Sequence, residues 1–63
     1  AHVQEYEAEQ WAFAVMRAEG VAIPRASLER AKAYVAHTIM RDMGSGCGHP
    51  IHLQAARFAN LAL

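Results

Sequence analysis

The first segment of the chain sets the strongest limit on its fold. It runs from His2 to Glu19 without a proline or a glycine, and Gly20 follows it directly. Acidic residues such as Glu5 suit the positive N-terminal end of a helix dipole, and helices often end at a glycine. We therefore expect a helix over residues 2–19.

The apolar residues of this first helix do not form a single stripe. On a wheel of 3.6 residues per turn, one broad face collects Val3, Ala8, Trp11, Ala14, Val15 and Ala18. Tyr6 and Phe13 fall on a second side, and Met16 falls on a third. A helix in a small bundle normally carries one apolar stripe opposite its polar residues. A helix that is apolar on several sides is expected to lie centrally or to be covered by a second chain.

Two further helices are expected after it. A short apolar connector ends at Pro24, which disfavours helical geometry in the residue before it. A second helix over about residues 26–43 then gathers one apolar stripe: Leu28, Ala31, Val35, Ala36, Ile39 and Met43. The glycine-rich run 44–48 ends this helix, and Pro50 suits the start of a third helix over about residues 50–61. The sequence thus predicts an all-α fold of three helices.

Length and composition limit the size of the core. A chain of 63 residues forms one small domain, expected to span residues 1–63. A domain of this size buries only about 60% of the surface of its unfolded chain, so partners are expected to add stability. Much of the apolar fraction is alanine, which favours helix but contributes little buried area. The chain begins with alanine rather than methionine, which fits methionine removal or a fragment of a longer protein.

Charge and cysteine content indicate the setting. The formal net charge is zero, which gives no general attraction to nucleic acid or anionic lipid. Cys47 is the only cysteine, so no disulfide can form within the chain, and no signal-like leader is visible. These features favour a reducing, cytoplasmic location. No apolar run approaches the ~18 residues of a membrane-spanning helix, so no membrane partner is expected.

Two groups of side chains are of the types that bind metal. The first group lies within six residues of sequence: Cys47, His49 and His52. Structural zinc sites usually take four ligands, however, and no second cluster follows. The second group, His2, Glu5 and Glu9, shares one side of the first helix, a pattern that is more often a solvated helix face than a metal site. We therefore expect no metal, no cofactor and no catalytic residue, and we do not expect an enzyme.

A basic and aromatic stripe lies opposite the apolar face of the second helix: Arg30, Tyr34, His37 and Arg41. Such a stripe could contact phosphate groups, and three helices in this order occur in helix-turn-helix domains. Against this, the connector before the third helix is long and rich in glycine, and the net charge is zero. A nucleic-acid-binding helical domain is therefore an alternative interpretation.

Residues 5–12, Glu-Tyr-Glu-Ala-Glu-Gln-Trp-Ala, resemble the helix that follows the zinc-binding motif in ImmA/IrrE-type metallopeptidases. The resemblance implies that Glu5 would be the third zinc ligand. It also implies three residues that pack the helix: Ala8, Trp11 and Ala12. The chain contains no His-Glu-x-x-His, so two ligands and the general base are missing. The resemblance therefore implies a C-terminal fragment of a zinc metallopeptidase-like protein, or a relic that keeps only the scaffold. Residues 20–36 also resemble uncharacterised proteins from bacterial mobile elements.

The sequence favours a non-catalytic interaction or oligomerisation module. If the second and third helices cover the face that holds Trp11, the other apolar sides of the first helix stay open. A homodimer, or another protein chain, would then cover them. The expected interaction residues are Tyr6, Phe13, Met16 and Arg17, with Arg17 reaching a carboxylate across an antiparallel pair. In the alternative packing, Tyr6 and Phe13 lie under the third helix, and the alanine-rich face is partly solvated.

Overall fold

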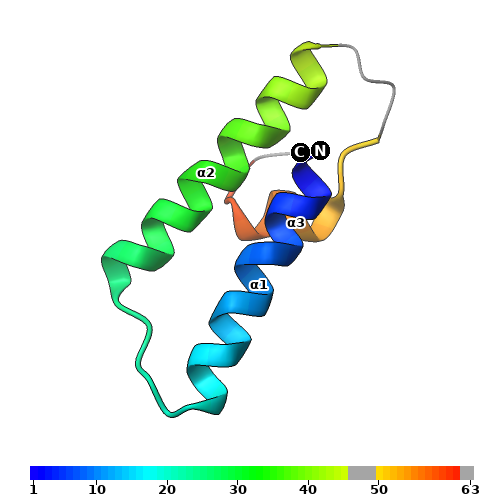
Figure 1. Ribbon diagram of the computed structural model, residues 1–63. Helices are drawn as coiled ribbons and strands as arrows, with labels where there is room; N and C mark the ends of the chain where they lie inside the picture. The colour runs from blue at the N-terminus through cyan, green and yellow to red at the C-terminus, as the bar shows by residue number, and fades with distance from the viewer. Residues whose placement is uncertain (46–49, 62–63) are drawn as a thin grey trace.

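A computed structural model describes residues 1–45 and 50–61 of the chain, which form three α-helices and no strand within those ranges (Figure 1). Helix α1 spans His2–Ala18, α2 spans Arg25–Gly44 and α3 spans Leu53–Phe58. The predicted all-α fold of three helices is confirmed. The bounds of α1 and α2 lie within one residue of those predicted, whereas α3 is much shorter than predicted. No helix in the described part of the chain is long and apolar enough to cross a membrane.

The predicted stop at Gly20 has a clear geometric basis. Gly20 has a φ of 73°, in the left-handed region that glycine adopts without strain. Its N–H donates to the carbonyl of Arg17 at 3.1 Å, and the N–H of Val21 donates to the carbonyl of Met16 at 2.8 Å. These two hydrogen bonds form a Schellman motif, which satisfies the last free carbonyls of α1 and turns the chain back towards α2.

The same motif explains why α3 is short. Asn60 has a φ of 61°, and its N–H donates to the carbonyl of Arg57, while the N–H of Leu61 donates to that of Ala56. At its other end, α3 begins only after His52, which has an extended backbone. The predicted helix over residues 50–61 therefore loses residues at both ends. Asparagine sometimes takes the place of glycine at this position, and here it ends the helix earlier than predicted.

The three helices enclose a core at one end of the molecule only. Helices α1 and α2 form an antiparallel hairpin, and α3 lies against the N-terminal half of α1 and the C-terminal half of α2 (Figure 1). The buried apolar residues in the described ranges are Phe13, Ala31, Val35, Ile39, Ala55 and Ala56. No residue from Ala14 to Arg30 is buried. We call the two ends of the hairpin the packed end, which holds α3, and the open end, residues 14–30.

The prediction of which face of α1 packs against the other helices is wrong. Trp11, at the centre of the face expected to meet the other helices, is 71% exposed, and Val15 is also exposed. Phe13, on the opposite side, is only 5% exposed. Helix α3 packs on the side of α1 that holds Phe13, so the Trp11 side faces outward. The apolar stripe predicted for α2 is largely confirmed, since Val35 and Ile39 are buried, although Met43 is exposed.

Candidate functional site

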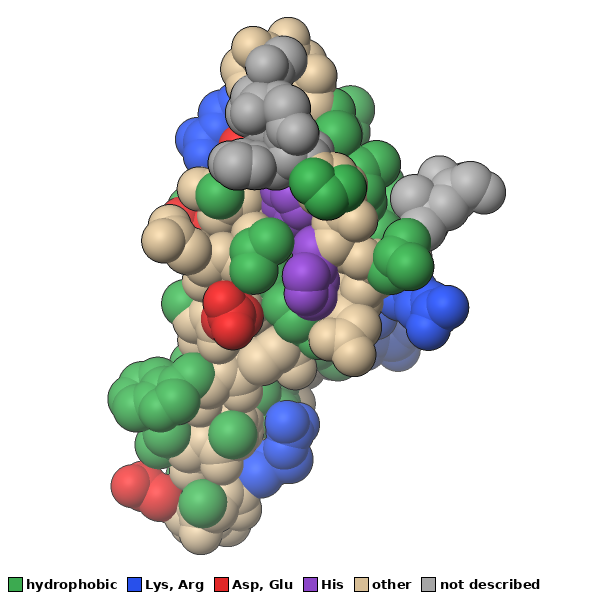
Figure 2. All heavy atoms as spheres, turned by 90° about the vertical axis from the view of Figure 1, so that its right-hand side faces the viewer, with side chains coloured by type: hydrophobic (Ala, Val, Ile, Leu, Met, Phe, Trp, Pro, Cys, Tyr) green, Lys and Arg blue, Asp and Glu red, His purple; other side chains and the backbone are tan. Residues whose placement is uncertain are grey.

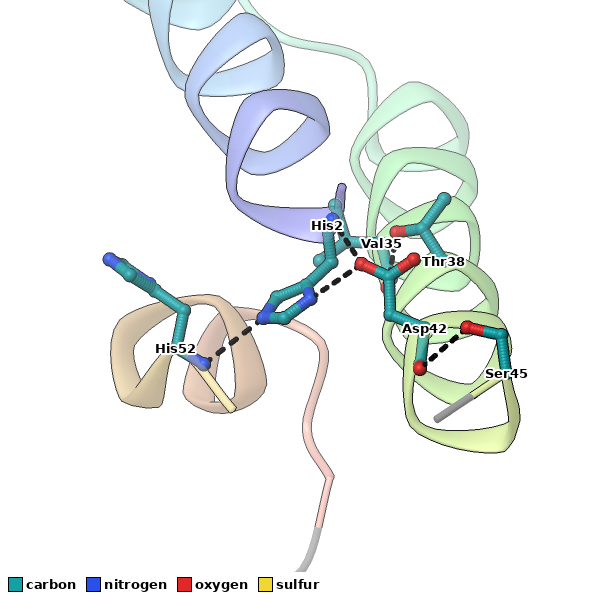
Figure 3. Close-up of polar contacts among 6 residues, drawn as sticks. All are labelled: His2, Val35, Thr38, Asp42, Ser45 and His52. Atoms are coloured by element: carbon teal, nitrogen blue, oxygen red, sulfur yellow. Dashed lines mark hydrogen bonds and ion pairs between the residues drawn. The ribbon is translucent and has the colours of Figure 1, made fainter. Parts of the chain in front are cut away.

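The first candidate site is a buried polar network at the packed end. His2, the first residue of α1, is 1% exposed. Its backbone N–H donates to Oδ2 of Asp42 at 2.6 Å, and its ring Nδ1 lies 2.8 Å from the same oxygen (Figure 3). Asp42 belongs to the last two turns of α2. One carboxylate therefore ties the start of α1 to the end of α2.

The second ring nitrogen of His2 reaches α3. Its Nε2 accepts a hydrogen bond from the backbone N–H of His52 at 3.1 Å (Figure 3). A backbone N–H can only donate, so Nε2 carries no proton in this arrangement. The proton of the neutral ring must then sit on Nδ1, where it is donated to Asp42. Through these contacts His2 joins all three helices.

His52 caps the short third helix. Its Nδ1 accepts a hydrogen bond from the backbone N–H of Ala55 at 3.1 Å, as an N-cap side chain does. The ring of Tyr6, from α1, lies 5.4 Å from the His52 ring, centroid to centroid. The prediction for His52 was a place in a possible metal-binding group with Cys47 and His49, and the expected cap of the third helix was His49; both Cys47 and His49 lie outside the described residues.

The hydrogen bonds from His2 also set the charge of Asp42. The side-chain hydrogen bond, and then the backbone hydrogen bond, hold the pKa of Asp42 below its usual value, although partial burial of the carboxyl opposes this shift. The Asp42 side chain is 13% exposed. It is therefore a carboxylate at neutral pH, and this matches the donors that His2 presents to it.

An aspartate–histidine pair is also the pattern of a general base. A catalytic histidine needs one ring nitrogen free to take a proton from a bound group. In this chain both ring nitrogens of His2 are engaged inside the protein, and the ring is shielded from solvent. The geometry favours a role in holding the helices together over proton transfer.

No pattern in the sequence indicates this network. His2 and Asp42 are separated by 40 positions, and His2 and His52 by 50. The sequence analysis placed His2 with Glu5 and Glu9 on a solvated face instead, which is wrong for His2 because the end of α2 covers it. Within the described residues, no three His, Cys, Asp or Glu side chains are placed to hold a metal ion.

The structure corrects the predicted interaction residues. Phe13 is buried, with its ring 6.4 Å from that of Phe58, and Tyr6 is half-buried, with its ring 5.7 Å from the same partner. Both belong to the packed end, so neither offers the free aromatic surface that the prediction required. Met16 is half-buried and Arg17 is exposed. The alternative packing, with Tyr6 and Phe13 under the third helix, is the one observed.

The second candidate site is the outward side of α1, which we call the Trp11 surface. It consists of four exposed apolar residues at helical spacing: Ala8, Trp11, Val15 and Ala18. Figure 2 shows hydrophobic side chains at the surface of the end of the molecule that lies away from the histidines. An exposed tryptophan with an apolar neighbour one turn away is the kind of feature that marks an interaction surface.

The basic stripe of α2 lies on the surface, as predicted. All four of its residues are exposed: Arg30, Tyr34, His37 and Arg41. Glu9 of α1 lines the same shallow hollow as Arg30 and Tyr34. This carboxylate lowers the positive potential at one end of the stripe, which weakens it as a phosphate-binding surface.

No known protein family, no curated protein and no solved structure matches the chain. The resemblance of residues 5–12 to ImmA/IrrE-type metallopeptidases therefore stays a prediction. The two sites have to be interpreted from their own geometry.

Proposed function

We propose that the chain is a non-catalytic helical interaction module that binds a second copy of itself through the Trp11 surface. The observation that carries this proposal is the exposure of Trp11 at 71%, at the centre of an apolar face that includes Val15. Aromatic side chains bury ~150–250 Å² each when covered, so a tryptophan dominates the binding energy of such a small surface. The proposal keeps the predicted module but moves its surface from Tyr6 and Phe13 to the opposite side of α1.

The shape of the fold supports a partner at the open end. Residues 14–30 include several apolar side chains, yet none of them is buried. Val21 is exposed, while Ile23 and Leu28 are only half-buried. A domain of 63 residues has a small core, and covering this end would add to it. A two-fold dimer is the commonest way for a small protein to do so.

The charges of α1 favour a second copy as the partner. Three glutamates lie in its first half, whereas its last turn holds Arg17. In an antiparallel pair centred on Trp11, Arg17 comes opposite the first turns of the second copy. At about 100° per residue, Glu7 borders the Trp11 surface about 40° from Trp11, whereas Arg17 lies about 120° away in the same direction, so Arg17 of each copy would have to extend its long side chain to reach Glu7 of the other. A parallel pair would instead bring the glutamates together.

A cytoplasmic location belongs to the same proposal. Cys47 is the only cysteine, so the module does not depend on an internal disulfide, and it can act under reducing conditions.

Light scattering of the purified chain over a range of concentrations tests this function. We expect the wild type to approach the mass of a dimer at high micromolar concentration, and Trp11→Ala to stay monomeric with an unchanged far-UV circular dichroism spectrum. Tyr34→Ala is the matched control, because Tyr34 is an exposed aromatic on α2, and it should dimerise like the wild type. A wild type that is monomeric throughout would contradict the proposal.

Charge reversal tests the antiparallel arrangement. Arg17→Glu should weaken the dimer, and adding Glu7→Arg should restore it, because the pair is then reversed. Failure of the double variant to recover would contradict the antiparallel arrangement while leaving the Trp11 surface in place.

The exposed stripe on α2 supports nucleic-acid binding as a second candidate. Non-specific binders of duplex DNA have dissociation constants of about 10⁻⁴ to 10⁻⁶ M near physiological salt, falling steeply as salt is lowered. Submicromolar binding at physiological salt, lost when Arg30 and Arg41 are both replaced by alanine, would favour this candidate over the interaction module.

A further inference from the structure

Two histidines hold the start of α3 through ring nitrogens that must be unprotonated. His2 Nε2 accepts the backbone N–H of His52, and His52 Nδ1 accepts the backbone N–H of Ala55, each at 3.1 Å. A protonated imidazole donates from both nitrogens and accepts from neither. Protonation of either ring would therefore set an N–H group against another N–H group and break the bond.

We propose that the docking of α3 onto the α1–α2 hairpin is a proton-sensitive switch, closed when His2 and His52 are neutral and released when they are protonated. Protonation of histidine side chains is a known way for proteins to switch between two packing arrangements.

The hydrogen bonds of His2 make the release selective. Asp42 of α2 accepts both the backbone N–H and the Nδ1–H of His2, and both donors remain when the ring is protonated. Added positive charge on the ring also strengthens its attraction to the Asp42 carboxylate. Protonation thus tightens the link between α1 and α2 while it removes the link between His2 and α3.

The groups that face the two rings do not change the expected effect of protonation, which is the release of α3 from the hairpin. From α2, Asp42 faces His2, and the amino group of Ala1 lies close enough to help lower the pKa of that carboxyl. From α1, Tyr6 faces His52, with the ring centroids 5.4 Å apart. The N–H of Ala55 donates to Nδ1 of His52 and to none of these groups.

Release of α3 would uncover apolar residues that are now buried in the core. Ala55 and Ala56 of α3 are fully buried against Val35 and Ile39 of α2. Helix α3 has only six residues, and a helix this short is not stable by itself. When its first turn is released, the helix should unwind and uncover the apolar side of α2. Mild acid would then expose a second apolar surface, at the opposite end from the open end.

Hydrogen exchange followed by nuclear magnetic resonance tests the switch in the intact chain. We expect the protection factors of the α3 amides to fall by about fivefold for each lost acceptor between about pH 7.5 and pH 5, while those around Val35 in α2 change much less. An α3 protection that stays constant, or that falls equally in α2 and α3, would overturn the proposal. The wild-type comparison decides this by itself.

Variants then assign the effect to the two rings. His52→Ser keeps an N-cap acceptor that does not titrate in this range, and should remove the part of the pH dependence that comes from His52. His37→Gln is the matched control, because His37 is exposed on α2 and outside the network; it should respond to pH like the wild type. A His52→Ser chain that retains the full pH dependence of α3, or a His37→Gln chain that loses it, would contradict the assignment.

Discussion

Replacing Phe13 by alanine should cost the domain most of its stability. Phe13 is 5% exposed, and its ring packs against Phe58 of α3. Three of the six buried apolar residues in the described ranges are alanines, so Phe13 supplies a large share of the buried area. Truncation of a buried phenylalanine to alanine costs about 3–5 kcal/mol. At ~0.05–0.15 kcal/mol per residue, a chain of this length has about 3–9 kcal/mol in total.

Trp11→Ala is the control, because it removes a larger aromatic from the same helix. Only about a third of the Trp11 side chain is shielded, so at ~25 cal/mol per Å² the loss should be at most about 1–2 kcal/mol. Urea unfolding, followed by far-UV circular dichroism at low micromolar concentration, measures both free energies of unfolding. If Phe13→Ala costs no more than Trp11→Ala, the assignment of Phe13 to the core and Trp11 to the surface is refuted.

Three smaller changes test the turns and the charge of the network. Asp42 has a lowered pKa in the folded chain. Its carboxylate therefore contributes stability above the unfolded pKa of about 3.9, and this stability is lost as the pH falls through the folded pKa. Asp42→Asn should remove this contribution and so flatten the acid side of the curve of unfolding free energy against pH, measured by urea unfolding. Gly20→Ala should lower the free energy of unfolding by about 1 kcal/mol through strain at positive φ alone, since no atom lies within 4 Å of the added methyl group. Asn60→Gly should be neutral or stabilising, and Asn60→Val should lower the melting temperature; equal melting temperatures for the two would contradict the left-handed turn.

The sequence predicts helix ends well where a residue restricts or frees the backbone conformation by its own chemistry. Gly20 and Pro24 mark the end of α1 and the start of α2, because their restrictions are local and do not depend on packing. Asn60 carries a similar signal, but a weaker one, because asparagine is also common inside loops and helices. This is why the end of α3 was placed too far along the chain.

The inner face of α1 could not be chosen from periodicity. Both sides of α1 are apolar, and the larger aromatic, Trp11, favoured the wrong one. Helix α3 buries the small Ala55 and Ala56 against α2 and places Phe58 beside Phe13, and small residues allow such close packing of segments. Size complementarity between segments far apart in sequence has no periodic signature. The network of His2, Asp42 and His52 also joins residues far apart in sequence, so no periodic pattern indicates it either.

Acrylamide quenching of tryptophan fluorescence, measured as a function of protein concentration, tests the central claim most directly, because Trp11 is the only tryptophan in the chain. The monomer exposes Trp11 and the proposed dimer covers it. We therefore predict strong quenching and red-shifted emission at low concentration, with weaker quenching and a blue shift as the dimer forms. A tryptophan that is protected at every concentration would contradict the fold, and one that stays fully accessible while the mass doubles would contradict the Trp11 surface as the place where the second copy binds.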